Sequence, residues 1–290
     1  MIRLLTHAGA WNTRDETAQQ TEIDAVKASI EAAKGSPDVV SAVEKAAIFL
    51  ENHPSLDAGF GSIIQMDGRI RMDAGIADSH GNYGAVVQIE EIQNPISVAR
   101  RLMELDYHHI LSGDGAKSFA LEQGFPRKSV YTLKRINSYL QLREEIPDLS
   151  YESLLKDKEE QIKKKLSTIG AVAVDDQGNL AVASSTGGLS YGYPGRVGDS
   201  ALLGHGMYCS KHVAVACTGH GEKIIITLLA QRVERYYLED QDLQKAVDQA
   251  ISDLGAAGGE GGIIAAAKDG SMAIGYNSSF LATHSEQIGG

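Results

Sequence analysis

Three short turns that contain aspartate and glycine constrain the fold of this 290-residue chain more than any other feature. They are Asp67-Gly68, Asp176-Gln177-Gly178 and Asp269-Gly270, and each separates two stretches of strand-like composition. Such turns are typical of β-hairpins, because glycine readily adopts the left-handed backbone conformation that a tight reversal needs. We therefore expect antiparallel hairpins in both halves of the chain.

Helical patterns lie between these hairpins. Apolar spacing, caps and stop signals predict helices over residues 14–34, 38–51, 94–106, 114–123, 222–237 and 242–254. Strands are predicted over residues 2–11, 62–66, 69–73, 84–91, 168–175, 179–185, 213–218, 263–267 and 271–276. Hairpins interrupted by pairs of helices predict one α+β domain, with two sheets packed back to back and helices outside them.

The central hairpin determines which residues face each other. In a hairpin with a three-residue loop centred on Gln177, residues that are equally far from Gln177 along the chain lie opposite each other. Thr168 should therefore face Thr186, with Cβ atoms about 5 Å apart. Two facing threonines are also a common structural pair in sheets, and this alternative stays open at this point.

Two loops carry residue types that suit the recognition of an amino acid. Within residues 194–200, Arg196 could bind a carboxylate through two hydrogen bonds, and Asp199 could hold an ammonium group. A local surface salt bridge between the two is the alternative. Residues 218–222 end a predicted strand and open a helix, which places backbone N–H groups where a developing oxyanion would be stabilised.

A threonine hydroxyl is a weak nucleophile unless a base lies beside it. The free α-amino group of an N-terminal threonine can act as that base, because its pKa of about 8 suits proton transfer near neutral pH. Thr168 could carry such an amine only after the bond to Ser167 is cut. The preceding segment, about 135–167, is rich in charged residues and has no strand pattern, as expected of a cleavable linker.

These residues belong to a series of motifs that spans almost the whole chain. The motifs are His7-Ala8-Gly9-Ala10-Trp11, Asp57-Ala58-Gly59-Phe60-Gly61-Ser62, Met72-Asp73-Ala74, Asn94-Pro95-Ile96 with Ala99-Arg100, Thr168-Ile169-Gly170-Ala171-Val172, Ser185-Thr186-Gly187-Gly188, Pro194-Gly195-Arg196-Val197-Gly198-Asp199-Ser200 and Thr218-Gly219-His220-Gly221-Glu222. In this order they resemble the plant-type (type 2) asparaginases with β-aspartyl (isoaspartyl) peptidase activity, which are N-terminal-nucleophile (Ntn) hydrolases.

The resemblance implies a four-layer αββα sandwich and a single domain that cuts itself into two chains. Residues 1–167 would form the α chain and residues 168–290 the β chain. Thr168 would be the nucleophile and the new N-terminus of the β chain. Thr186 would hydrogen-bond to it and tune its amine.

The resemblance also implies the rest of the site. Thr218 and the N–H group of Gly219 would form the oxyanion hole. Arg196 and Asp199 would hold the α-carboxylate and the α-amine of the substrate, with Gly219 and Gly221 also contacting it. The implied reaction converts L-asparagine or a β-aspartyl dipeptide to L-aspartate through a covalent β-aspartyl ester on the threonine.

Family members bind a structural, non-catalytic sodium ion through backbone carbonyls, which implies such a site near residues 51–61. They usually work as dimers of αβ units, and no other cofactor is implied. The chain departs from the family pattern at three positions. Ser167 stands where relatives have glycine, or aspartate in the glycosylasparaginase and taspase branches, while Asp57 replaces asparagine and Ala8 replaces glycine.

Composition narrows the expected partners and location. The 27 Lys and Arg against 38 Asp and Glu give a net charge of −11, which disfavours binding to nucleic-acid phosphates. No segment has the length of a membrane helix, and the start lacks the apolar run of a signal peptide. Cys209 and Cys217 form neither a disulfide framework nor a metal pattern. We therefore expect a cytoplasmic enzyme with a small substrate and no nucleic-acid or membrane partner.

Two alternatives remain. One is a glycosylasparaginase or a taspase-like threonine hydrolase, although both would have aspartate at position 167, and the pairing of Arg196 with Asp199 favours a small free amino acid. The other is an unprocessed, inactive homologue that acts as a binding or scaffold protein, which Ser167 and Asp57 motivate.

A denaturing gel of the purified protein separates these readings. Two bands that correspond to residues 1–167 and 168–290 are expected, because the hydrolase needs the free amine of Thr168. A single full-length band, together with no ammonia release from asparagine and no cleavage of β-aspartyl dipeptides, would favour the inactive homologue.

Overall fold

The computed structural model describes residues 1–11, 16–146, 150–152, 168–190 and 192–289. The predicted cleavage residue Ser167 and most of the predicted linker beyond residue 146 lie outside the described residues.

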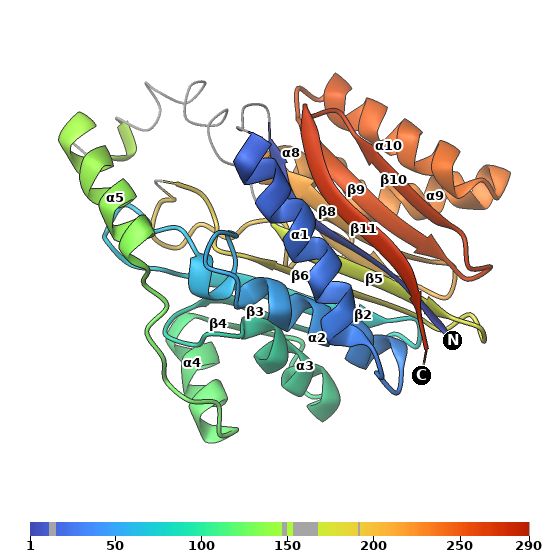
Figure 1. The fold of residues 1–290 in the computed structure, drawn as a ribbon, viewed down its shortest axis with the longest axis horizontal. Coiled ribbons are helices and arrows are strands. Elements are labelled where there is room, and N and C mark those ends of the chain that lie inside the picture. Colours follow the sequence, from blue (N-terminus) through green and yellow to red (C-terminus); the bar gives the residue numbers. More distant parts are fainter. Residues whose placement is uncertain (12–15, 147–149, 153–167, 191, 290) are drawn as a thin grey trace.

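A seven-stranded sheet runs through the centre of the molecule (Figure 1). Its strands follow the order β11 (Phe280–Ile288), β1 (Ile2–Trp11), β5 (Ile169–Asp175), β6 (Leu180–Thr186), β2 (Met72–Asp78), β3 (Tyr83–Ile89) and β4 (Ile110–Ser112). Neighbouring strands are antiparallel, except that β3 and β4 are parallel. The N-terminal strand therefore lies between two strands from the second half of the chain.

A second sheet packs against the first. Its order is β10 (Met272–Tyr276), β9 (Gly261–Ala267), β8 (Val213–Gly219) and β7 (Met207–Cys209), all antiparallel. A buried apolar cluster between the sheets includes Leu5, Val172, Val182, Ala214, Ala216 and Ile264. The expected back-to-back arrangement of two sheets is therefore present.

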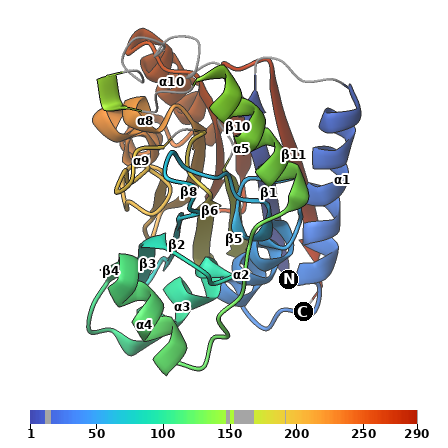
Figure 2. The ribbon, with the colours of Figure 1, turned by 90° about the vertical axis from the view of Figure 1, so that its left-hand side faces the viewer.

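Helices cover the outer faces of both sheets (Figures 1 and 2). The first sheet is covered by α1 (Glu16–Ala33), α2 (Val39–Glu51) and α3 (Pro95–Leu105). The second is covered by α8 (Gly221–Thr227), α9 (Leu229–Asp240) and α10 (Leu243–Ala256). Two more helices, α4 (Gly113–Glu122) and α5 (Leu133–Glu145), lie beyond β4 along the chain.

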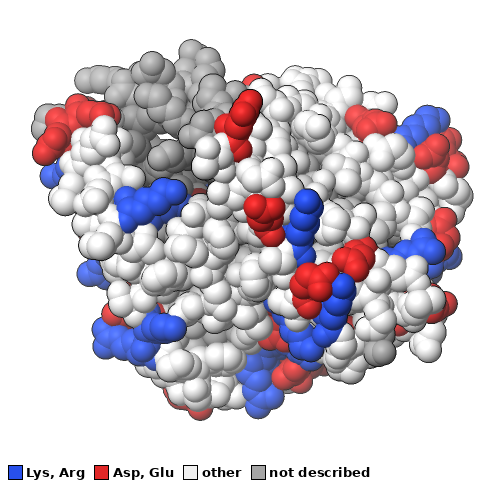
Figure 3. Space-filling model, in the orientation of Figure 1, with Lys and Arg blue, Asp and Glu red and all other residues white. Residues whose placement is uncertain are grey.

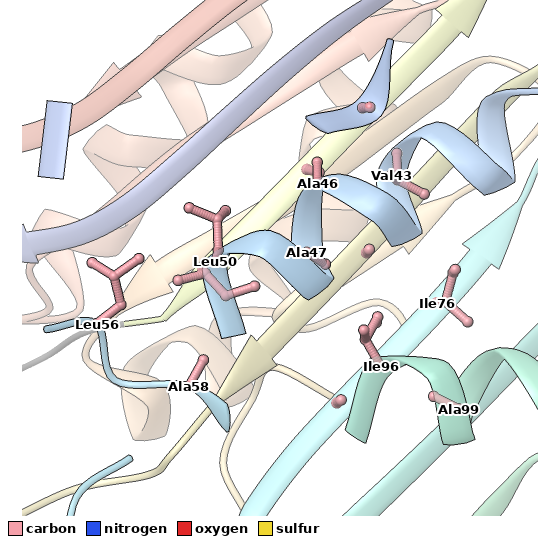
Figure 4. Close-up of a cluster of buried hydrophobic side chains, with 14 of the residues drawn as sticks. Val43, Ala46, Ala47, Leu50, Leu56, Ala58, Ile76, Ile96 and Ala99 are labelled. Atoms are coloured by element: carbon pink, nitrogen blue, oxygen red, sulfur yellow. The ribbon is translucent and has the colours of Figure 1, made fainter. Parts of the chain in front are cut away.

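Helix α2 shows how the sequence produces this packing. Asp38 caps its start, because the Oδ1 atom accepts a hydrogen bond of 2.7 Å from the N–H of Ser41. Val43 and Leu50 lie two turns apart on one face and are fully buried. Both belong to the apolar cluster that also contains Ile96 of α3 (Figure 4). The burial of Leu50 holds the C-terminal end of α2 against the core, and the glycine-rich loop begins directly after it.

Several elements differ from the expectation. The turn at Asp67-Gly68 is present, but residues 62–66 and 69–71 form no strand, so this is not a hairpin, and the strand predicted over residues 69–73 begins only at Met72. The short strands β4 and β7 and the long strand β11 were not expected. The helix predicted over residues 222–237 is two helices, because Leu228 has a left-handed backbone (φ 52°) and separates α8 from α9.

Charged side chains of both signs are interspersed on the face shown in Figure 3. Ion pairs such as Lys34 with Glu286 and Arg100 with Glu44 join different elements. Nowhere in the described chain is there a helix with the length and apolar character needed to cross a membrane.

The packing of α3 on β3 can be tested at one glycine. A Cβ atom on Gly84 would lie 2.2 Å from the carbonyl oxygen of Ala99, so α3 would have to move. We expect Gly84→Ala to lower the free energy of unfolding by about 1–3 kcal/mol, the usual cost of overpacking, measured by denaturant titration.

Gly115 provides the matched control. It lies within α4, and nothing lies within 4 Å of the position that its Cβ would take. Gly115→Ala should leave stability unchanged or raise it by up to about 1 kcal/mol. Equal destabilisation by both substitutions would contradict the close contact at Gly84.

Candidate active site

Thr168 lies directly before β5 and is 6% exposed. Its carbonyl oxygen accepts a hydrogen bond of 3.1 Å from the N–H of Gly9, which continues the pairing of β1 with β5. Its Oγ1 atom lies 3.4 Å from the Oγ atom of Ser200, a fully buried residue. The expected nucleophile is thus held by backbone pairing on one side and contacts a buried hydroxyl on the other.

The predicted register of the central hairpin is confirmed. Ile169 lies opposite Ser185, and Gly178 at the turn has a left-handed backbone (φ 81°). One further step in this register leads to Thr168 and Thr186. The Oγ1 atom of Thr186 accepts a hydrogen bond of 3.1 Å from the N–H of Gly188. A direct hydrogen bond between the two threonines stays a prediction.

Arg196 and Asp199 converge on Gly221, the first residue of α8. A Cβ atom on Gly221 would lie 2.7 Å from both the Nη2 atom of Arg196 and the Oδ1 atom of Asp199. Only glycine leaves room for both groups at this point. The loop at residues 194–200 therefore meets the segment at residues 218–222, while the substrate-binding role of Arg196 and Asp199 stays a prediction.

Asp199 is a buried carboxyl that is 5% exposed. Burial raises its pKa to about 7, against the positive charge of Arg196, which lowers it. No described residue hydrogen-bonds to its Oδ2 atom. Arg196 forms its ion pair with Glu222 instead, at 3.0 Å, so the local salt bridge between Arg196 and Asp199 is not the arrangement found.

Thr218 and Gly219 lie at the end of β8. Thr218 is fully buried, and its Oγ1 atom has no hydrogen-bond partner among the described residues. Gly219 has a φ of 133°, and a Cβ atom there would lie 2.3 Å from the carbonyl oxygen of Glu260. The backbone conformation at this strand end therefore requires glycine, and it leaves an unused buried hydroxyl beside it.

A glycine-rich loop after α2 lies against the end of β6. The carbonyl oxygen of Asp57 accepts a hydrogen bond of 2.8 Å from the N–H of Gly187, the residue after Thr186. The Oδ1 atom of the buried Asp57 side chain accepts a 2.9 Å bond from the N–H of Ile63. The carboxyl group at this departure from the family pattern is thus used inside the loop.

Comparison with known proteins decides the family. The asparaginase family model matches residues 2–288. The chain belongs to the asparaginase family. It is 36% identical over 264 residues to a plant-type L-asparaginase of Pyrococcus horikoshii, which covers 87% of this chain and 85% of the relative.

Other relatives of this asparaginase-family chain have similar identity. An isoaspartyl peptidase/L-asparaginase of Bos taurus is 35% identical over 272 residues, or 92% of this chain and 86% of the relative. An isoaspartyl peptidase of Escherichia coli is 36% identical over 258 residues, or 86% of this chain and 78% of the relative. The family resemblance seen in the motifs is therefore confirmed.

Two residues at the site had no role in the sequence-based prediction. Ser200 contacts Thr168, and Glu222 pairs with Arg196. Burial alone would raise the pKa of Glu222, but the charge of Arg196 lowers it overall. Ser200 and Glu222 are each the last residue of a recognised motif. Their contacts with other segments of the chain become visible only in the fold.

Two carbonyls near the expected sodium site have a cationic partner. Of the carbonyls near residues 51–61, those of Leu56 and Gly61 accept hydrogen bonds of 3.4 and 2.7 Å from the guanidinium of Arg135. A sodium ion at these oxygens would meet a fixed positive charge, so they do not fit it.

Glu51 is a second buried carboxyl beside the site. Its Oε1 atom accepts hydrogen bonds from the Oγ of Ser185, at 2.7 Å, and from the N–H of Ile96, at 3.1 Å. Burial raises its pKa to about 8, although these hydrogen bonds oppose the shift. The group therefore joins α2, β6 and α3 mainly as a neutral acid.

The raised pKa of Glu51 predicts how stability depends on pH. The unfolded carboxyl ionises near its ordinary pKa of 4.5, whereas the folded one keeps its proton to about pH 8. The contribution of this group to stability is therefore full below the unfolded pKa and is lost as pH rises through the folded one, by up to about 1.4 kcal/mol per pH unit.

We expect Glu51→Gln to flatten the decline in unfolding free energy between about pH 5 and pH 8, measured by denaturant titration. The exposed Glu239 provides the control, and Glu239→Gln should keep the wild-type pH dependence. An identical pH profile in wild type and Glu51→Gln would contradict a protonated Glu51.

Proposed function

We propose that this chain is a threonine-nucleophile hydrolase that converts L-asparagine and β-aspartyl dipeptides to L-aspartate after it cuts itself before Thr168. The observation that carries this proposal is the meeting of Arg196 and Asp199 at Gly221, in a loop whose next residue, Ser200, contacts Thr168. A binding site for an α-amino acid, formed by Arg196 and Asp199 and called the clasp below, thus lies beside a hydroxyl nucleophile. The names of the relatives, L-asparaginase and isoaspartyl peptidase, support the same activity.

Substrate binding uses the two charges of the clasp. The guanidinium of Arg196 holds the α-carboxylate, which competes with Glu222 for the same donors. The carboxylate of Asp199 holds the α-ammonium group. Because the pKa of Asp199 is raised to about 7, a substrate ammonium group would favour its ionised form.

The reaction has two chemical steps. In the first, the freed α-amine of Thr168 takes the proton of its own hydroxyl, and Oγ1 attacks the side-chain carbonyl carbon of the substrate. The C–N bond breaks, and ammonia or the peptide amine leaves with that proton. In the second, the same amine activates a water molecule, which hydrolyses the β-aspartyl ester and releases L-aspartate.

Thr218 and Gly219 stabilise the negative charge that develops on the carbonyl oxygen. The hydroxyl of Thr218 supports this role because it is buried and has no partner among the described residues, so it can donate to the substrate. Thr186 tunes the amine of the nucleophile, a role supported by the β5–β6 register, in which the next step after Ile169 and Ser185 leads to the two threonines. Gly221 completes the substrate contacts.

The same proposal covers the architecture and assembly of the enzyme. The two sheets and their covering helices form the αββα sandwich of Ntn hydrolases, with residues 1–167 as α chain and 168–290 as β chain. The active form is a cytoplasmic homodimer of αβ units. Its only partner in catalysis is the small substrate, without nucleic acid or membrane.

Replacement of the nucleophile tests the proposal directly. Thr168→Ala should abolish both self-cleavage and hydrolysis, measured on a denaturing gel and by ammonia release from asparagine, because the hydroxyl serves both reactions. Hydrolysis of β-aspartyl-leucine should be lost in parallel. Persistence of either reaction would show that another residue is the nucleophile.

Replacement of the clasp should separate binding from processing. Arg196→Ala should raise KM for asparagine by about 10²-fold or more, because a charged hydrogen-bonding partner of the substrate is lost. Self-cleavage should continue, since the precursor presents no substrate carboxylate. Loss of cleavage in this variant would instead assign Arg196 a structural role.

A further inference from the structure

Helix α5 lies on the glycine-rich loop through one arginine. The half-buried Arg135 donates from Nε to the carbonyl oxygen of Gly61, at 2.7 Å, and from Nη2 to that of Leu56, at 3.4 Å. These two oxygens lie at the two ends of the loop that contains the 3₁₀ turn η1 (Gly59–Gly61). A single guanidinium therefore bridges the loop.

Neighbouring side chains hold α5 against the same region. Tyr131 donates its hydroxyl proton to the carbonyl oxygen of Gly68 at 2.9 Å, and Tyr139 donates to that of Met66 at 3.0 Å. Thr132 caps the helix by accepting a hydrogen bond from the N–H of residue 135. The position of the guanidinium is thus set by contacts on both sides of it.

The loop that Arg135 bridges collects backbone carbonyls. A Cβ atom on Gly61 would lie 1.9 Å from the carbonyl oxygen of Leu56 and 2.8 Å from that of His53. One on Gly59 would lie 2.3 Å from that of Glu51. Backbone carbonyl oxygens therefore crowd both Gly59 and Gly61, and their partial negative charges favour a nearby cation or strong donors.

We propose that the Arg135 guanidinium is the cation of this loop and takes the place of the sodium ion that the family resemblance implies. A guanidinium stays charged at all ordinary pH values and presents several N–H donors in a rigid plane, which suits two carbonyls at different positions. Sodium would have to compete with a charge that is covalently part of the chain.

The loop connects this cation to the active site. Asp57, one residue after Leu56, accepts through its carbonyl a hydrogen bond from the N–H of Gly187, and Thr186 precedes that glycine. Arg135 is therefore a positioning residue: it acts on the threonine pair through the loop. This kinetic consequence rests on the proposed function, whereas the role of the guanidinium as loop cation does not.

Thermal unfolding with different salts tests the cation without any assay of activity. The wild-type Tm should be the same in sodium chloride and in choline chloride at equal ionic strength. Arg135→Ala should lower Tm by about 4–8 °C in choline chloride. Guanidinium chloride, at a concentration too low to denature wild type, should restore part of the loss in this variant. A sodium-specific rise in the wild-type Tm would overturn the proposal.

Two further variants keep the test decisive. Arg143→Ala removes an exposed arginine from the same helix and should leave Tm unchanged in every salt. Arg135→Lys keeps the charge but not the planar pair of donors, so it should remain folded and recover only part of the stability. If Arg135→Lys and Arg135→Ala both have the wild-type Tm, the guanidinium does not stabilise the glycine-rich loop, and the proposal is wrong.

Kinetics separate a positioning role from a loss of stability. At a temperature where all variants are folded, Arg135→Ala should lower kcat by about 10-fold and leave KM for asparagine within about 2-fold, because the loop adjoins the threonines rather than the Arg196 clasp. Guanidinium should raise kcat of this variant alone. An increase in KM with unchanged kcat would contradict the proposed path through Gly187.

Discussion

The pairing of β5 with β1 on one side and β6 on the other is the constraint on which the rest of the site depends. It places Thr168 at the strand start and sets the distance to the loops at the same end of the sheet. The pairing also demands glycine at position 170, where a Cβ atom would lie 2.4 Å from the Nε2 atom of His7. Burial lowers the pKa of that histidine to about 3, so it fills the space as a neutral ring.

Two buried carboxyl groups, those of Glu51 and Asp199, lie near these paired strands. They differ in the hydrogen-bond donors that they contact. Glu51 finds its donors within the fold, from β6 and α3. Asp199 has a raised pKa, and no described residue hydrogen-bonds to its Oδ2 atom. The two acids thus differ in their hydrogen bonding, although burial raises the pKa of both.

The sequence predicted the parts of the fold that depend on local signals. The hairpins at Asp176-Gln177-Gly178 and Asp269-Gly270 and the register around Gln177 involve residues close together in the chain, where turn chemistry decides the outcome. Strand β11 was missed because its pattern is weak and its pairing with β1 joins opposite ends of the sequence. The break at Leu228 was missed because a left-handed leucine has no local signature.

The same distinction holds at the site. Each half of the Arg196–Asp199–Gly221 cluster was visible as a motif, but the partner of Arg196 in Glu222 and the contact of Ser200 with Thr168 arise from tertiary packing. The guanidinium in the glycine-rich loop comes from a helix that the sequence indicated only as part of a charged linker. Contacts between distant segments leave no pattern that spacing alone can show.

The strand order has a consequence for a chain that is cut after residue 167. Reading across the first sheet, β11, β5 and β6 come from after the cut, whereas β1, β2, β3 and β4 come from before it. Strand β1 is enclosed by strands of the other piece on both edges. Strands of the two pieces are thus interleaved in one sheet. Separation of the pieces would break the hydrogen bonds between β1 and both of its neighbours. Cleavage would free the N-terminus of Thr168 while the two chains stay associated. Chains produced separately would have to fold together to form the sheet.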